Sequence, residues 1–310
     1  MTSPQKLKSF ALLLGSLLLS ASRCGATVDL DSPVPARAAA LGEASTALTG
    51  DLSALHFNPA GLVGIDRKQT AFSLEQGVAG DQSGSADFGM PFGRGTLAAG
   101  LTYADAGDVD LYSTLGDFRT VKGQRDYVAT VSYGQKFHRE HWYDIRWYRL
   151  RWLRNVSMGV SAKLLRSSLV EEFSATAFAL DAGALYEYAG KTGGFSLGLS
   201  FQNMGTPVKY RGKTDPLPAV SRAGLSWRYR RARTAVDLSR STLEGTQSHF
   251  GLEYKITDIL ALRAGGKTGN DFNSTMMGFG LNPKNVQIDY ALGVAGNLGQ
   301  THRLTFSVKY

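Results

Sequence analysis

The last eight residues, Arg303–Tyr310, read RLTFSVKY and set the pattern that decides the fold. Leu304, Phe306, Val308 and Tyr310 alternate with polar residues, so a strand here presents one apolar face and one polar face. A strand of about ten residues with two such faces can cross a bilayer, with lipid on one side and water on the other. We therefore predict a transmembrane strand whose terminal insertion signal is formed by Phe306, Val308 and Tyr310.

The same period of two recurs from residue 67 to the end of the chain, and turn-forming residues such as Asn282-Pro283 separate the segments. A secreted β-sandwich or propeller also alternates, but a terminal aromatic residue is typical of a bacterial membrane barrel. The predicted fold class is therefore all-β, a transmembrane antiparallel β-barrel of about 14 strands with an N-terminal helical hatch or plug. The expected strands are 67–78, 83–92, 95–105, 125–138, 154–168, 175–188, 194–204, 219–230, 233–241, 247–257, 259–267, 273–281, 285–294 and 301–310, which together make the barrel domain, 67–310.

Composition excludes several other classes. The 310 residues contain one cysteine, which excludes a disulfide-stapled fold and a cysteine-rich zinc site. The chain has no run of about 20 apolar residues, so it is not a polytopic helical membrane protein. Lys and Arg number 34 against 26 Asp and Glu, a formal net charge of +8, and the 36 glycines exceed the usual share.

The first 26 residues resemble a secretory signal peptide. Lys6 and Lys8 precede the apolar run 10–21, and Cys24-Gly25-Ala26 is an acceptable cleavage site. A lipoprotein with a lipidated Cys24 is the alternative, but Arg23 occupies a position that normally holds a small residue. Both interpretations take the chain out of the cytoplasm, and with the barrel they predict an integral protein of the bacterial outer membrane.

Residues 27–66 form the predicted hatch segment. The run 36–41 favours a helix, Leu41 and Leu48 share one apolar face, Gly50 is the expected C-cap, and Asp51 can cap a second short turn. This segment is either a solvated helix ahead of a domain or a plug inside the barrel. A type I turn is expected at the motif Asn58, Pro59, Ala60 and Gly61.

If the apolar strand faces meet lipid, the opposite faces line a charged lumen. Opposite charges on neighbouring strands can pair across such a wall, either to stiffen it or to form a selective lining for a solute. The expected lumen charges are Lys163, Asp181, Arg228, Arg230, Asp237, Glu253, Lys255, Arg263, Asp289, Arg303 and Lys309.

The connector 138–154 combines aromatic and basic residues. Trp and Tyr favour the headgroup zone of a membrane, and Arg favours anionic headgroups. We expect an interfacial anchor here, or else a docking surface for a partner. Its residues are Trp142, Arg146, Trp147, Arg149, Arg151 and Trp152.

The sequence offers little for catalysis. None of the five histidines lies in a nucleophile motif or at metal-ligand spacing, so we predict no enzyme activity, no catalytic residue, no metal and no cofactor.

Several motifs together resemble the FadL-like outer-membrane proteins, and within them the PorV/PorQ branch. The likeness covers nearly the whole chain after residue 26. It is carried by Ala36-Arg37-Ala38 with the Asn58–Gly61 motif, and by the segments 159–164, 177–186, 202–206, 216–218, 251–254 and 299–303.

This resemblance implies a 14-stranded barrel with the hatch folded into its lumen. On the FadL side it implies passive transport of hydrophobic small molecules through a hatch-gated barrel. On the PorV side it implies the alternative, a non-transporting barrel that binds partners in type IX protein secretion or surface assembly. The expected partners are outer-membrane lipid, the barrel-insertion machinery, and either a hydrophobic ligand or secretion-system proteins, but not nucleic acid.

Overall fold

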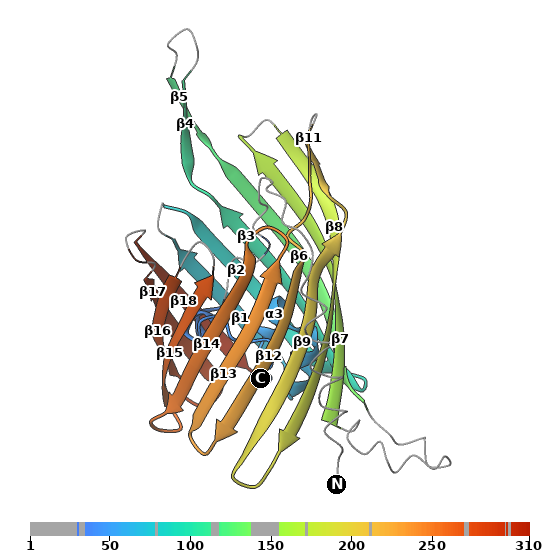
Figure 1. The fold of residues 1–310 in the computed structure, drawn as a ribbon, viewed down its shortest axis with the longest axis vertical. Coiled ribbons are helices and arrows are strands. Elements are labelled where there is room, and N and C mark those ends of the chain that lie inside the picture. Colours follow the sequence, from blue (N-terminus) through green and yellow to red (C-terminus); the bar gives the residue numbers. More distant parts are fainter. Residues whose placement is uncertain are drawn as a thin grey trace, which may run out of the picture.

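The structure is a computed structural model in which fourteen antiparallel strands close into one barrel (Figure 1). It describes residues 30, 35–77, 80–112, 118–137, 155–170, 173–210, 213–269, 273–294, 296 and 299–310. The predicted signal peptide and the Trp142 to Trp152 anchor lie outside these residues.

The barrel confirms the predicted fold class, and each expected strand overlaps an observed one. The strands are β1 (Gln69–Gln76), β2 (Gln82–Phe92), β3 (Gly95–Asp105), β6 (Gln124–Lys136), β7 (Val156–Leu169), β8 (Phe173–Ala189), β9 (Gly193–Gly205), β12 (Val220–Tyr229), β13 (Ala232–Ser241), β14 (Gly245–Lys255), β15 (Leu260–Gly269), β16 (Asn273–Leu281), β17 (Val286–Val294) and β18 (Gln300–Lys309). Strand β18 pairs with β1 and closes the barrel, so neither is left as a free edge.

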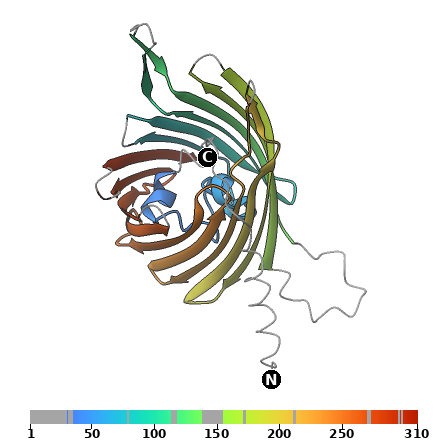
Figure 2. The ribbon, with the colours of Figure 1, turned by 45° about the horizontal axis from the view of Figure 1, so that its top comes forward.

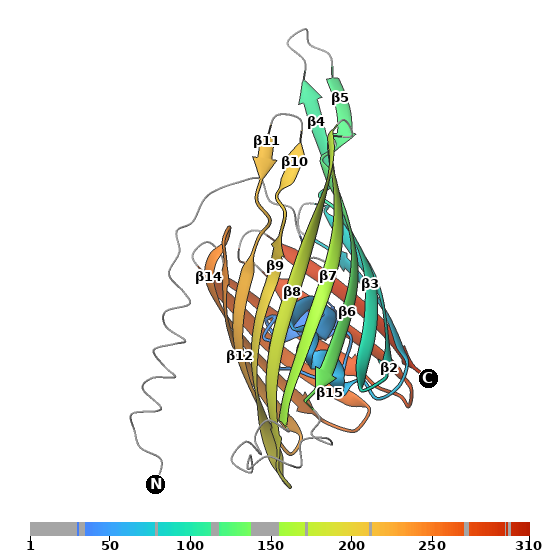
Figure 3. The ribbon, with the colours of Figure 1, turned by 90° about the vertical axis from the view of Figure 1, so that its right-hand side faces the viewer.

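Two hairpins interrupt this simple order, and the sequence pattern did not predict them. Strands β4 (Asp108–Tyr112) and β5 (Phe118–Lys122) extend from β3 and β6, and β10 (Val208–Tyr210) pairs with β11 (Lys213–Asp215) between β9 and β12. Both hairpins rise at the same end of the barrel, opposite the short turns (Figure 3). We call these two ends the long-loop end and the short-turn end.

Side chains divide between the two faces of the wall as the alternation predicts. Phe178 and Leu180 on β8 are about 60% exposed on the outside, whereas Ala177, Ala179 and Asp181, which alternate with them, are buried on the inside. The same division holds on the other barrel strands, where large apolar side chains are exposed on the outer face. This continuous apolar exterior is the surface that a transmembrane barrel turns to lipid. In the described part of the chain, no helix has the length and apolar character needed to cross a membrane.

Residues 35–65 fold inside the barrel (Figure 2). Helix α2 (Ala36–Ala40) contacts β15 to β18, helix α3 (Ala54–Phe57) contacts β3, and the 3-10 helix η1 (Pro59–Gly64) contacts β3 and β6 to β8. The segment therefore crosses the lumen from one wall to the other. Of the two arrangements that the sequence allowed, a solvated helix ahead of the barrel and a plug inside it, the structure has the plug.

The local structure of this segment differs from the prediction in two places. The first helix ends at Ala40 instead of Gly50, because Gly42 and Glu43 both have a positive φ, 64° and 65°, and turn the chain. The Asn58 motif does not stop at one turn. It continues as η1 to Gly64, with the Asn58 side chain accepting a hydrogen bond from the backbone N–H of Ala60.

The exposed apolar exterior makes a direct prediction for Phe250, which is half exposed on the outside of β14. Replacement Phe250→Lys should destabilise the barrel in liposomes by about 2–4 kcal/mol, since a lysine near the midplane must leave water. The measurement is the urea unfolding midpoint of the barrel in lipid, with Phe250→Leu as the matched control. Equal stability of the two variants would mean that this face does not contact lipid.

Candidate functional site

A collar of small residues around the inner wall receives the hatch. Ten of the fourteen strands carry a lumen-facing glycine at which a Cβ atom would collide with, or crowd, the hatch backbone, its side chains or a neighbouring wall group. Strands β1, β13 and β17 carry Ala71, Ala235 and Ala291 instead, each packed against hatch residues. The ten glycines are Gly89, Gly100, Gly134, Gly159, Gly183, Gly198, Gly224, Gly251, Gly265 and Gly278.

The Asn58 motif occupies the part of this collar formed by β6, β7 and β8. A Cβ on Gly134 would lie 2.6 Å from the carbonyl oxygen of Pro59, and Cβ atoms on Gly159 and Gly183 would collide with Pro59 and Asn58. The fully buried Asn58 amide donates hydrogen bonds to the carbonyl oxygens of Thr46 (2.8 Å) and Ala184 (3.2 Å). The amide therefore joins two parts of the hatch to the wall, and burial makes loss of either bond costly.

On the opposite side, the turn at Gly42 lies against β14 and β15. A Cβ on Gly42 would lie 2.6 Å from the carbonyl oxygen of Phe250, so only glycine provides both the positive φ and the close approach. The buried His249 ring bonds the carbonyl oxygen of Gly42 through Nδ1 (2.8 Å) and the hydroxyl of Ser239 through Nε2 (2.8 Å).

Ion pairs fix helix α2 between the strands. The Arg37 guanidinium binds both carboxylate oxygens of Glu253, at 3.0 and 3.1 Å, and also binds Asp51 of the hatch. Arg263 binds Glu253 at 2.8 Å and reaches Asp289 on β17 at 2.7 Å. It can reach over β16 because Gly280 presents no side chain there. The result is a buried chain of alternating charges with Arg37 at the hatch end.

A second ion pair connects Glu43 to Lys267 on β15, with 3.2 Å between Nζ and Oε2. Burial acts to raise the pKa of the Glu43 carboxyl, but nearby positive charges, of which Lys267 is the strongest, together outweigh it and hold the pKa at about 2, below the ordinary value of 4.5. Glu43 is therefore charged at neutral pH, and the pair contributes to seating of the hatch.

The long-loop half of the lumen contains a packed cluster of buried apolar side chains, which we call the apolar chamber. Its wall consists of buried small and branched residues of β6, β7 and β8, and β10 with the segment after β11 covers it from inside. Leu30, the only described residue before Pro35, is packed within it. The other members are Val128, Leu165, Ala175, Ala177, Ala179, Val208 and Leu217.

A polar layer lies next to this chamber, on the short-turn side, and is formed by side chains of β7, β8 and β9. Lys163 pairs with Asp181 at 2.9 Å and donates to the Asn203 side chain at 2.8 Å. Asn203 has a φ of 58° and lies next to the register shift between Leu180 and Ala182, where β8 and β9 form a bulge. The layer therefore separates the apolar chamber from the η1 seat.

The remaining predicted residues have mixed placements. Asp237 accepts a hydrogen bond from the backbone N–H of Thr46 (2.7 Å), and Arg303 binds Glu75 on β1 at 2.7 Å. Leu41 and Leu48 pack against Ala235. The terminal strand presents Phe306, Val308 and Tyr310 on the outer face, with Leu304, and the Tyr310 N–H donates to the carbonyl oxygen of Lys68.

Three predicted lumen charges lie at or near the short-turn end, with Arg228, Lys255 and Lys309 at the ends of their strands. Arg230 corrects the prediction. It lies beyond β12 in the turn, with a φ of 52°, and its guanidinium carbon lies 5.4 Å from the centre of the Tyr229 ring. The strand ends one residue earlier than expected, so the alternation no longer directs this side chain into the lumen.

Sequence reasoning missed the cations and acids that hold the hatch. Arg37, Glu43, Asp51 and Lys267 were not among the predicted charges, although Arg37 is the one charged residue in an otherwise alanine helix. Such an arginine signals a buried partner when the helix is enclosed on all sides. In the described part of the chain, no group of three or more His, Cys, Asp or Glu side chains is arranged to hold a metal ion.

Known structures share this architecture. No protein-family model and no curated protein matches the sequence. The structure of the P. putida toluene transporter TodX matches with a TM-score of 0.64 and 12% identity, over 91% of this chain and 99% of that chain. The TodX monoaromatic hydrocarbon channel deltaS2 mutant matches with a TM-score of 0.60 and 13% identity, over 90% and 98%. At these identities the similarity establishes a common barrel fold.

The collar predicts the effect of adding one methyl group to the wall. Gly134→Ala should push the η1 segment away from β6 and cost about 1–3 kcal/mol, as overpacking of a closed site does. Limited proteolysis should then cut the hatch faster, while the barrel still shows its heat-modifiable electrophoretic mobility. Gly84→Ala is the control, because a Cβ there would be 3.4 Å from its nearest neighbour. An equally protected hatch in both variants would contradict the close fit.

The Glu43–Lys267 pair predicts an acid-sensitive contribution to stability. Because the folded protein holds the pKa of Glu43 at about 2, below 4.5, this contribution is complete above pH 4.5 and is lost as the pH falls toward 2. Urea midpoints measured at several pH values between 6 and 2 should fall less steeply in Glu43→Gln than in the unmodified protein. Parallel curves would show that the pair does not stabilise the fold.

Proposed function

We propose that the protein is an outer-membrane channel for small hydrophobic molecules, with the hatch controlling passage through the barrel. The observation that carries this proposal is the apolar chamber in the long-loop half of the lumen. A water-filled pore is lined by polar side chains, whereas this section of wall is formed by Val128, Leu165 and alanines. Its chemistry suits an apolar guest.

Leu30 supports the same interpretation. Its isobutyl side chain is 9% exposed and packs among the chamber residues, so the chamber accepts a branched apolar group of about the size of a small hydrocarbon. The fold similarity to the toluene transporter TodX also favours a hydrophobic cargo. The hatch fills the lumen next to the chamber, so axial passage requires part of the hatch to move.

Export and membrane insertion belong to this proposal. We infer that residues 1–26 direct the chain out of the cytoplasm, and that the barrel-insertion machinery places it in outer-membrane lipid with the short-turn end in the periplasm. The apolar exterior supports the lipid contact. The PorV-like alternative, a partner-binding barrel in secretion or surface assembly, depends on the connector 138–154, which lies outside the described residues.

The test is uptake of the hydrophobic dye N-phenylnaphthylamine by cells that carry the protein in the outer membrane. Ala177→Trp adds a bulky side chain to the chamber, because Ala177 is fully buried among its residues, and should slow the uptake several-fold. Phe178→Trp is the matched control, because Phe178 is next to Ala177 in the sequence but faces outward.

Binding of the same dye to the purified barrel provides a second measurement. Saturable fluorescence enhancement should be lost in Ala177→Trp and retained in Phe178→Trp. If uptake and binding are unaffected by filling the chamber, the protein does not conduct hydrophobic molecules by this route.

A further inference from the structure

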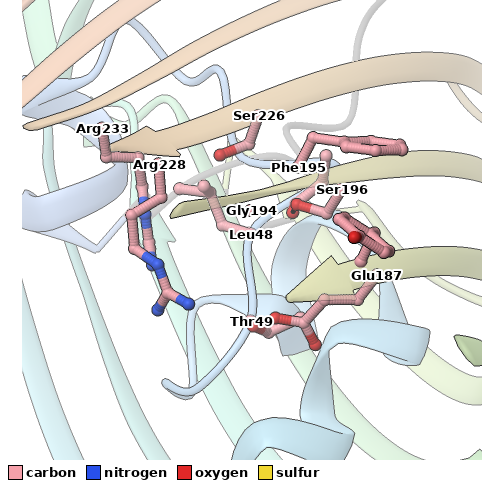
Figure 4. A pocket seen from close by; sticks show the side chains of 11 residues that line it. Leu48, Thr49, Glu187, Gly194, Phe195, Ser196, Ser226, Arg228 and Arg233 are labelled. Carbon is pink, nitrogen blue, oxygen red and sulfur yellow. Dashed lines mark hydrogen bonds between the residues drawn. The ribbon is translucent and has the colours of Figure 1, made fainter. Parts of the chain in front are cut away.

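A separate polar pocket lies near the short-turn end, between the hatch and the wall (Figure 4). The hatch residues 47–49 form one side of it, and β8, β9, β12 and β13 form the other. Gly194 on β9 is the register partner of Arg228 on β12, and Glu187 on β8 lines the same pocket. The apolar chamber lies in the other half of the lumen, so this pocket is not part of it.

Two arginines face each other across this pocket wall. Arg228 on β12 is the direct register partner of Arg233 on β13, and both line the pocket. Figure 4 shows the two side chains reaching into the same hollow. Like charges at directly opposed positions of a sheet repel and destabilise it. Within the described residues, neither guanidinium forms a hydrogen bond or an ion pair.

The nearby carboxylates are engaged elsewhere. Glu253 is the register partner of Arg233 on its other side, but its two oxygens bind Arg37 and Arg263. Asp51 binds Arg37 and the Ser53 hydroxyl. Glu187 lines the pocket without forming an ion pair to either arginine. The arginine pair is thus held at a half-enclosed site where Glu253 and Asp51 act on Arg233 only through space, without an ion pair to either guanidinium.

Paired guanidiniums of this kind suit a tetrahedral oxyanion. Each guanidinium offers several N–H donors in a planar fork that matches phosphate geometry, and two positive charges match a phosphate dianion. The Ser226 and Thr49 hydroxyls border the same pocket and can add hydrogen bonds. We propose that Arg228 and Arg233 form a phosphate-binding site at the short-turn mouth of the lumen, which takes either free phosphate or the phosphate of a lipid headgroup.

The site is independent of the hydrophobic-transport proposal, because it uses other residues and another part of the lumen. Binding of an anion there would relieve the repulsion between β12 and β13 and would strengthen the contact between the wall and hatch residues 47–49. The expected consequence is a protein that is more stable with phosphate than without it.

The experiment is calorimetric titration of the full-length barrel in dodecyl maltoside with inorganic phosphate. One site should be saturable, and its affinity should fall by at least about tenfold in Arg228→Gln and in Arg233→Gln, the change expected when a charged bidentate contact is lost. Arg230→Gln is the matched control, since it removes the same charge from the adjacent turn outside the pocket. A second arm uses dihexanoylphosphatidylglycerol, and displacement of phosphate by this lipid would identify a headgroup site.

Thermal unfolding distinguishes a folded variant that has lost the phosphate site from a variant that has failed to fold. Without phosphate, Arg233→Gln should unfold at the same or a higher temperature than the unmodified protein, because the repulsion is gone. Phosphate should then stabilise the unmodified protein and Arg230→Gln but not Arg233→Gln. The proposal is overturned if neither ligand binds, or if Arg230→Gln weakens binding as much as the two pocket variants do.

Discussion

The close approach of the hatch backbone to the barrel wall is the constraint on which the rest of the structure depends. A barrel of fourteen strands encloses a wide lumen. A hatch segment of about thirty residues can lie close against the wall only where the wall residues have small side chains or none. Glycine at Gly134, Gly159 and Gly183, and alanine at Ala235 and Ala291, provide that space. The glycine excess of the sequence therefore has a structural cause beyond turns, because much of it forms a collar of matched height on neighbouring strands such as β6, β7 and β8.

The two sides of this collar hold the hatch by different forces. On β6 to β8 the contacts are backbone packing and the Asn58 amide, which depend little on salt or pH. On β14 to β17 the contacts are the charge chain through Arg37 and Glu253 and the pair of Glu43 with Lys267. Buried ion pairs add little net stability, since desolvation offsets their attraction, but removal of one partner is costly. The charges therefore fix the position of helix α2 more than they stabilise the barrel.

The sequence was sufficient to predict the strands of the barrel wall and their faces, but not the contacts between charged side chains inside the lumen. Alternation along each strand predicts which residues face outward, because the side-chain period of two is fixed by strand geometry, and β18 follows it from Leu304 to Val308. The hairpin β10–β11 was missed because three-residue strands carry too little alternation to be read. The charge pairs were missed for another reason. Arg263 meets Asp289 two strands away only because Gly280 lies between them. Such a contact depends on the register in which the strands pair, which the sequence alone does not reveal.

The lumen is consequently divided along its axis, and the division has a physical logic. Apolar side chains around Leu30 occupy the long-loop half, while the layer of Lys163, Asp181 and Asn203 lies between them and η1. In the transport proposed above, an apolar guest in the chamber would gain nothing by entering this layer, because it would have to displace satisfied polar contacts. Movement of the α2 side of the hatch, which is held by charges, offers a path that leaves the packed Asn58 seat on β6 to β8 intact. The uneven anchoring of the hatch therefore allows one side to yield while the other keeps the segment in register.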